Sequence, residues 1–427
     1  MIYFYNPHYG PFYGRNVFNA LTGRFDHRKY WYLASHLLSK AGKGEARILV
    51  NLDQNSFQML FTYKFRPLNR LVTLAEFAAW LILNRINPLR VRPKFSFRGL
   101  GKGDVVFAFA FDNLQRRESL LAGLENSGCA KVIHLTHYML HTSSVSSHSA
   151  RLGEVFFAAE SDLSKYPFFK KHFPWYSKSA YLLPFIPQER FYSRTPFRDR
   201  KMKCLALGTL TILKRSEETR DVMDFFGTDC IHPMRRAIYE NRSGITEYVD
   251  SGVSLYNTDT AVKDLSARKS AVAKLYLALW NLLKANRRSY FSFSAADRFN
   301  QYALAVIPEE INHLPGISWA ETMACGCAYI GTDDPMYTDL GLVPGEHYLA
   351  YDGTLGGLLK VIRGCQEDPA LAERIAENGR RFVAERLSAE KAAGLFFSDL
   401  KKLERRLKEG ASYQELSFIS SFARSEK

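Results

Sequence analysis

The sequence predicts an α/β protein with two doubly wound domains, each built on a mostly parallel sheet. Short apolar runs alternate with helical stretches along most of the chain, as in repeated βα units. The 427 residues exceed one ordinary core and suit two domains of about 200 residues each. A charged segment with prolines, "IPQERFYSRTPFRDRKMK", interrupts the alternation at 186–203. We therefore place the domains at 1–195 and 196–400, with a basic C-terminal helix and tail at 401–427.

The first domain contains six runs with the length and composition of strands. They lie at 2–5, 47–52, 105–111, 131–135, 155–159 and 181–185. The apolar stretch at 71–83 includes Thr73 and Glu76 and is shorter than the ~20 residues of a membrane span, so we expect a helix there. The serine-rich run 143–149 predicts a mobile loop.

The second domain starts a new series of βα units. Its predicted strands lie at 204–207, 222–226, 302–307, 328–330 and 348–351. From Pro369 to about Glu409, apolar residues recur at three- and four-residue steps, which predicts helices at the end of the domain.

Composition and charge narrow the classes of function. With 46% apolar and 14% aromatic residues both domains can bury a core, which argues against disorder. The net charge of +15 predicts an anionic partner, and nucleic acid, anionic lipid and a phosphorylated or acidic sugar all remain open. The first ten residues lack the pattern of a secretion signal, so we expect a cytoplasmic protein. The six cysteines are scattered, and we expect them to be reduced and buried.

The segment "LPGISWAETMACGCAYIGT" at 314–332 predicts a nucleotide site. The run from Glu321 to Cys327 has helical composition, includes a glycine suited to a helix C-terminus, and leads into an apolar strand. The N-terminus of such a helix presents free N–H groups to a phosphate, and a nearby carboxylate can hold ribose hydroxyls. Upstream, Gly208 in "LALGTLTILK" would open a loop toward a phosphate, with Lys214 reaching the phosphate oxygens. The alternative is an ordinary strand and loop with a surface lysine, which has the same pattern.

The stretch "PEEINHLPGISWAETMACGCAYIGTDDPMYTDLGLVPGEHYLAYDGT" resembles the donor-nucleotide half of retaining GT-B glycosyltransferases. The resemblance covers roughly 204–390 and implies two Rossmann-like domains facing each other across a cleft. It implies that Glu310 contacts the donor sugar, that Glu321 contacts the ribose, and that Lys214 contacts phosphate. The predicted donor-binding residues are Gly208, Thr209, Lys214, His232, Arg235, Glu310, His313, Gly316, Glu321 and Thr322.

The sequence departs from that family in two places. Ten residues separate Glu310 from Glu321 where the family has seven, and His313 occupies the seven-spaced position. Thr209 stands where an arginine usually follows the strand-end glycine. The missing phosphate charge predicts a donor other than an ordinary UDP- or GDP-hexose.

A substitute cation is present in "FFGTDCIHPMRRAIYENRSG" at 225–244. The pair His232-Pro233 resembles the transferases of CMP-activated acidic sugars, in which the histidine contacts a single phosphate, and Arg235 and Arg236 follow it. The whole arrangement is similar to the bacterial retaining Kdo transferases of lipopolysaccharide and capsule assembly. The alternative is a histidine that caps a helix, with the proline in the first turn of that helix.

Two carboxylates are candidates for the chemical step. Asp229 is read as the end of an apolar strand, three residues before His232, and would attack the sugar as a nucleophile. Glu160 follows the strand in "EVFFAAE", at the sheet edge where α/β proteins bind ligands, and would transfer a proton. A helix cap explains either acid equally well. His134 and His137 are candidates for acceptor contacts, and we expect no metal and no cofactor besides the nucleotide-sugar.

The stretch "KYPFFKKHFPWYSK" at 165–178 mixes aromatic residues with lysines, and "FTYKFRPLNR" at 61–70 is similar. This composition suits the headgroup layer of an anionic membrane, while stacking on single-stranded nucleic acid is the alternative. The sequence as a whole predicts a peripheral, metal-independent glycosyltransferase that moves a sugar, favoured to come from CMP-Kdo or a similar acidic CMP-sugar, to a glycan or glycolipid. The alternatives are a UDP- or GDP-hexose enzyme and a non-catalytic basic α/β protein that binds nucleotide or nucleic acid.

Overall fold

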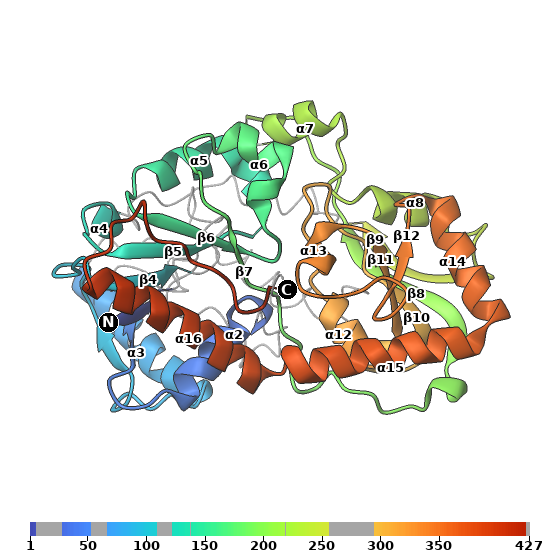
Figure 1. Cartoon of the computed structure of the whole chain (residues 1–427), viewed down its shortest axis with the longest axis horizontal. Helices are drawn as coiled ribbons and strands as arrows, with labels where there is room; N and C mark the ends of the chain where they lie inside the picture. The colour runs from blue at the N-terminus through green and yellow to red at the C-terminus, as the bar shows by residue number, and fades with distance from the viewer. Residues whose placement is uncertain are drawn as a thin grey trace. The chain divides into compact units, whose positions relative to one another are not determined.

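The computed structural model describes residues 1–5, 28–52, 66–108, 122–136, 138–217, 219–255 and 294–423 (Figure 1). Two sheets hold the described strands, and every strand pair with a described register runs parallel. The α/β class with parallel sheets is therefore confirmed. Among these residues the chain forms two compact units, a first with 1–157 and 400–417 and a second with 158–255, 294–399 and 418–423.

The seven-stranded sheet has the strand order β3-β2-β1-β4-β5-β6-β7. Its central strands are buried at every position, which explains why they read as continuous apolar runs rather than alternating ones. The strands are β1 (Ile2–Tyr5), β2 (Ala46–Leu49), β3 (Arg92–Lys94), β4 (Val105–Ala108), β5 (Ala130–His134), β6 (Val155–Ala159) and β7 (Tyr181–Leu182). Of the strands of this sheet, β3 has no counterpart among the predicted runs, and in the other sheet the same holds for β9 (Val249–Leu255).

The predicted mobile loop at 143–149 is wrong, because these residues belong to helix α5 (Thr142–Ala150). Serine hydroxyls there donate back to helix carbonyls, as Ser149 Oγ does to Val145 O at 2.7 Å, so a buried serine-rich helix keeps its polar groups bonded. The neighbouring helical segments are α2 (Arg28–Lys40), α3 (Arg66–Leu83), α4 (Ala122–Glu125), η4 (Tyr138–His141), η5 (Leu163–Lys165), α6 (Pro167–His172) and η6 (Phe197–Asp199).

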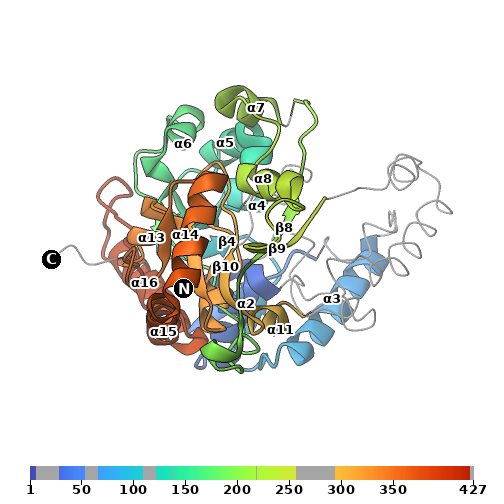
Figure 2. The same cartoon turned by 90° about the vertical axis from the view of Figure 1, so that its right-hand side faces the viewer.

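The five-stranded sheet lies within the second unit and has the order β12-β11-β10-β8-β9. Two pairs of helices cover it: α8 and α14 contact each other and the sheet, and so do α12 and α15 (Figure 1). Helix α8 lies beside β8 and β9 (Figure 2). Its residues Met234 and Ile238 belong to the buried core. The strands are β8 (Lys201–Leu210), β9 (Val249–Leu255), β10 (Tyr302–Val306), β11 (Ala328–Thr332) and β12 (Leu349–Tyr351).

The predicted strand at 222–226 is also wrong, since Arg220–Phe226 forms helix α7. Only Val222 of this helix is buried, and Gly227 ends it with a left-handed φ of 64°. Five apolar residues are too few to distinguish a strand from a helix turn by period. The remaining helices are α8 (Pro233–Asn241), α11 (Ala295–Phe299), α12 (Trp319–Ala324), α13 (Pro335–Thr338), α14 (Leu355–Glu367), α15 (Pro369–Arg386) and α16 (Ala389–Lys408).

Two further expectations concern cysteines and membranes. All six cysteines are free and buried, as predicted. In the part of the chain that the structure describes, no helix combines the length and apolarity that crossing a membrane requires. The stretch 71–83 is helical as expected, within α3.

Candidate functional site

The predicted donor-binding residues lie at the carboxyl ends of β8 and β10 and at the starts of α8 and α12. Because β8, β10 and β11 are parallel neighbours, the loops that follow them meet at one edge of the sheet. Ile311 N donates to Ile231 O at 3.0 Å, which joins the loop after β10 to the segment before α8. The edge is thus built from segments that are far apart in the sequence.

Arg235 connects the ends of β8 and β10. Its guanidinium donates to Thr209 O at 3.0 Å and to Pro308 O at 3.1 Å, and the residue is 9% exposed. Gly208 lies inside β8 and does not open a loop, which corrects the prediction. A Cβ on Gly208 would stand 2.5 Å from Arg235 Nε, so the glycine makes room for the arginine. The Arg235 guanidinium thus holds the ends of β8 and β10 together, next to the residues predicted to bind phosphate.

His232 stands directly before α8, with Pro233 in the first turn of that helix. This is the cap position that the alternative interpretation expected, although the His232 side chain makes no capping hydrogen bond. The side chain is 5% exposed, and its Nδ1 lies 3.2 Å from Glu309 O. His232 is therefore held against the loop after β10, which also carries Glu310.

The backbone of the segment that contains Lys214 pairs with the backbone of the segment that contains Asp229. Leu213 N donates to Asp229 O at 2.7 Å, next to the antiparallel bridge between Ile212 and Cys230. Asp229 does not end a strand, which corrects the basis of its prediction, because the segment before it is helix α7. Its Oδ1 accepts a hydrogen bond from Arg236 at 2.7 Å, while the Lys214 side chain is exposed.

The loop after β10 forms a tight turn around Glu310 and His313. Glu310 N donates to Leu314 O at 2.9 Å, and His313 N donates to Glu310 O at 3.1 Å. His313 adopts a left-handed φ of 61°, which few residues other than glycine accept. Just beyond the turn, a Cβ on Gly316 would stand 2.4 Å from Ile307 O, so this position needs a glycine for packing.

The short helix predicted to carry an acid in its first turn is confirmed as α12. Glu321 lies in the first turn and is 3% exposed. Thr322 is buried, and its Oγ1 donates to Ser318 O at 2.8 Å within the same turn. Gly326 follows the helix with a φ of 77°, as a glycine after a helix C-terminus does.

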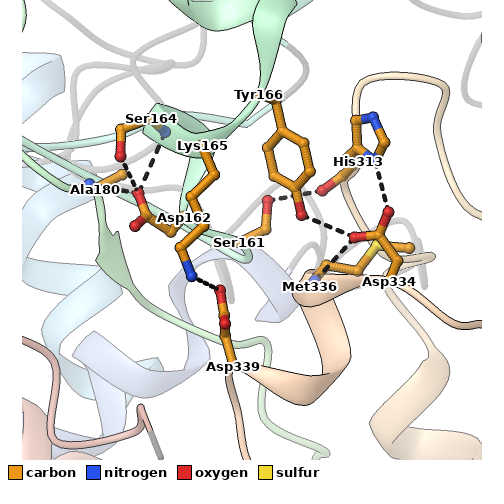
Figure 3. A network of polar contacts seen from close by, with 10 residues as sticks. All are labelled: Ser161, Asp162, Ser164, Lys165, Tyr166, Ala180, His313, Asp334, Met336 and Asp339. Carbon is orange, nitrogen blue, oxygen red and sulfur yellow. Dashed lines mark hydrogen bonds and ion pairs between the residues drawn. The ribbon is translucent and has the colours of Figure 1, made fainter. Parts of the chain in front are cut away.

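A network that the sequence did not predict surrounds His313 (Figure 3). Asp334 Oδ2 lies 2.6 Å from His313 Nδ1, and Asp334 Oδ1 accepts from Tyr166 OH at 2.8 Å. The rings of Tyr166 and His313 stack, with centroids 4.0 Å apart and planes at 8°. Ser161 Oγ donates to His313 O at 2.7 Å. The histidine is therefore held through both its ring and its backbone.

Glu309, the acid next to Glu310, belongs to a buried cluster of tyrosines. Its Oε1 accepts from Thr332 N at 3.0 Å and from Tyr337 OH at 2.9 Å, which ties β10 to β11 and α13. Burial raises the pKa of Glu309, although these hydrogen bonds partly oppose the rise. Both acids of the "PEE" motif are buried, and Glu309 joins the loop after β10 to β11 and α13.

Three of the predicted residues, Glu160, His134 and His137, belong to the strands of the seven-stranded sheet or to the loops after them, and the structure describes the first two. Glu160 directly follows β6, as predicted, and is 2% exposed. His134 ends β5 and is buried, with its ring near Phe107. His137 lies outside the described residues.

The aromatic residues of 165–178 do not form a membrane-facing surface. Five of them, Tyr166, Phe168, Phe169, Phe173 and Tyr176, are buried, whereas Trp175 is 37% exposed. Phe169 and Phe173 stack on each other at 4.4 Å. Most of the aromatic part of the pattern is therefore core, and its lysines and Trp175 remain for an anionic surface.

Comparison with known proteins gives one match to a family. Residues 279–397 match the family described as "Glycosyl transferase-like", which confirms the predicted glycosyltransferase domain over that part of the chain. The match includes the loop after β10, α12 and the segment around Asp334. No curated protein matches the chain.

Solved structures show weak similarity. HepE from Anabaena, whose structure contains UDP, is 13% identical with a TM-score of 0.48, over 94% of this chain and 99% of that one. A glycosyltransferase from Rickettsia africae is 10% identical with a TM-score of 0.45, over 96% of this chain and 98% of that one. Sucrose-phosphate synthase from Thermosynechococcus elongatus is 13% identical with a TM-score of 0.36, over 96% and 99%. At these values the similarities establish nothing further about the chain.

Proposed function

We propose that the protein is a retaining GT-B glycosyltransferase whose second unit binds a nucleotide-activated sugar. The observation that carries the proposal is the edge where β8 and β10 end, at which Arg235 and His232 bond to the backbone of the loop that carries Glu310. Glu310 lies within the residues that match the glycosyltransferase family, 279–397. Glu321 would hold the ribose from the first turn of α12, as a carboxylate beside a nucleotide-binding sheet edge does.

The donor in this proposal is CMP-Kdo or a similar acidic CMP-sugar. A single phosphate needs fewer cations than a diphosphate, which fits Thr209 in place of an arginine and an Arg235 already bonded to two backbone carbonyls. Lys214, His232 and a helix end would stabilise the leaving phosphate without a metal. A UDP- or GDP-hexose is the alternative donor.

The acceptor in this proposal is a glycan or glycolipid of the bacterial surface. It would receive the sugar on the inner side of the membrane. His134 and His137 are the proposed acceptor contacts, and Glu160 is the proposed proton donor or acceptor. Transfer with retention would pass through a sugar ester on Asp229, which a second step resolves.

A nucleotide thermal-shift screen tests the donor. A ligand at 100 times its Kd stabilises the folded state by about 2.7 kcal/mol and so raises the melting temperature. If the donor is a CMP-sugar, CMP should raise the melting temperature more than UDP or GDP. Glu321→Gln should remove most of this shift, whereas Glu373→Gln, an exposed acid on α15, should keep it. A larger shift with UDP or GDP would move the proposal to a hexose donor. No shift with any nucleotide would contradict nucleotide binding altogether.

We also propose that exposed lysines of α6 hold the protein at an anionic membrane. Lys170 and Lys171 are exposed, and each lysine near such a surface contributes about 1 kcal/mol. We expect binding to phosphatidylserine vesicles that weakens as salt rises, and a clear loss of binding in a Lys170→Ser, Lys171→Ser variant. The control, Lys360→Ser with Lys391→Ser, removes the same charge from exposed positions elsewhere. Equal loss in the control would show that only net charge matters.

A further inference from the structure

The backbone places His313 with unusual constraint. A left-handed φ of 61° costs free energy for a residue with a Cβ, and such conformations persist only where the surroundings fix them. Here the turn from Glu310 to Leu314 closes on itself, and Ser161 Oγ donates to His313 O at 2.7 Å. The position of the imidazole is thus set by several independent contacts.

The contacts of the ring decide which nitrogen carries the proton. Burial alone would raise the pKa of Asp334, but hydrogen bonds from His313, Met336 N and Tyr166 outweigh burial and lower this pKa. An ionised carboxylate only accepts hydrogen bonds, so the 2.6 Å contact requires a proton on Nδ1. A neutral imidazole then has its lone pair on Nε2, which makes Nε2 a proton acceptor.

The accepting nitrogen faces away from its carboxylate. Figure 3 shows Nε2 on the far side of the ring from Asp334, while Tyr166 covers one face of the ring. The His313 side chain is 38% exposed, whereas His134 and His232 are buried residues. Among these three histidines, His313 is the one whose ring is both oriented and open to a reactant.

The charges around the pair suit a base. Lys165, the residue before Tyr166, forms an ion pair with Asp339 at 2.5 Å, so Asp339 and not Asp334 offsets its charge. Asp334 therefore remains available to stabilise the imidazolium that forms when Nε2 takes a proton. Tyr166 OH and Met336 N, at 2.8 and 2.9 Å, keep the carboxylate oriented.

We propose that His313, in place of Glu160, is the base that removes the proton from the acceptor hydroxyl, with Asp334 and Tyr166 as positioning residues. This inference rests on the proposed glycosyl transfer. The acceptor oxygen forms its bond to the sugar C1 as its proton passes to Nε2. The bond from C1 to the Asp229 carboxylate, formed when the donor phosphate left in the first step, breaks with its electron pair on that carboxylate. The proton later goes from Nε2 to solvent.

The test uses the full chain and measures steady-state nucleotide release, over many turnovers, from CMP-Kdo and from UDP-glucose with water as the acceptor. His313→Gly suits the left-handed backbone and leaves room for a free imidazole. We expect this variant to release nucleotide 10²–10⁴-fold more slowly than wild type, while the thermal shift with free nucleotide is kept. Added imidazole should restore part of the rate in His313→Gly and should not change the rate of His347→Gln, a control histidine beside Glu346.

Three results would overturn the inference, and they differ from failure of the proposed function. A His313→Gly rate close to wild type would show that no proton passes through the ring. A slow variant that imidazole does not rescue, and that melts lower or loses its nucleotide shift, would assign His313 a structural role. A wild-type protein that binds nucleotide but releases none from either donor would refute the transfer itself, and the base role with it.

Discussion

Gly316→Ala is expected to lower the free energy of unfolding by about 1–3 kcal/mol or more, because the added methyl group meets backbone. Its Cβ would stand 2.4 Å from Ile307 O and 3.0 Å from Ile307 C, and neither atom can rotate away. The loop that begins α12 would have to move, since Trp319 N donates to Gly316 O at 2.9 Å. Urea denaturation followed by circular dichroism measures the change.

Gly364→Ala is the matched control for this substitution. Gly364 is exposed within α14, and its added Cβ would meet nothing within 4 Å. Alanine in a helix interior is favoured over glycine by roughly 0.5–1 kcal/mol, so this variant should be slightly more stable than wild type. If Gly316→Ala kept wild-type stability but lost nucleotide binding, the glycine would be needed by the ligand and not by the packing.

Features of the site with local signals could be predicted from the sequence. The helix α12 has small residues, an acid in its first turn and a glycine after its end, all within one short segment. The strands β6 and β10 are fully buried, so their apolar runs stood out. The misassigned helix α7 and the unpredicted strand β9 lack such signals, because α7 is short and β9 carries Asp250, Ser251 and Ser254.

Features that depend on tertiary contacts could not be predicted. Tyr166 and Asp334 are 168 positions apart, and nothing in either neighbourhood points to the other. The role of Arg235 depends on carbonyl oxygens of Thr209 and Pro308, which carry no residue-specific signal. One local signal for Asp334 was available: an aspartate directly before a proline is a common helix start, and Asp334 does cap α13 through Met336 N.

Asp229→Asn is expected to reduce turnover by about 10⁴-fold or more while the protein stays folded. If Asp229 attacks the sugar, the amide keeps the shape of the side chain but is a poor nucleophile. The fold should tolerate the change, because the Asp229–Arg236 pair involves side chains 41% and 30% exposed and such pairs contribute about 0–1 kcal/mol. The backbone bond from Leu213 N to Asp229 O does not depend on the carboxylate.

Arg236→Gln separates the two roles of the Asp229 carboxylate, because it breaks the same ion pair and leaves the nucleophile in place. We expect Arg236→Gln to keep most of the nucleotide release from CMP-Kdo that Asp229→Asn loses. Glu160→Gln should be slower than wild type by 10²–10⁴-fold if Glu160 transfers a proton.

Intact-mass measurement of wild type with donor and no acceptor should reveal a sugar ester, which peptide mapping should place on Asp229. An ester on another residue would refute this assignment. Equal losses in Asp229→Asn and Arg236→Gln would show that the ion pair, and not the nucleophile, is what the enzyme needs.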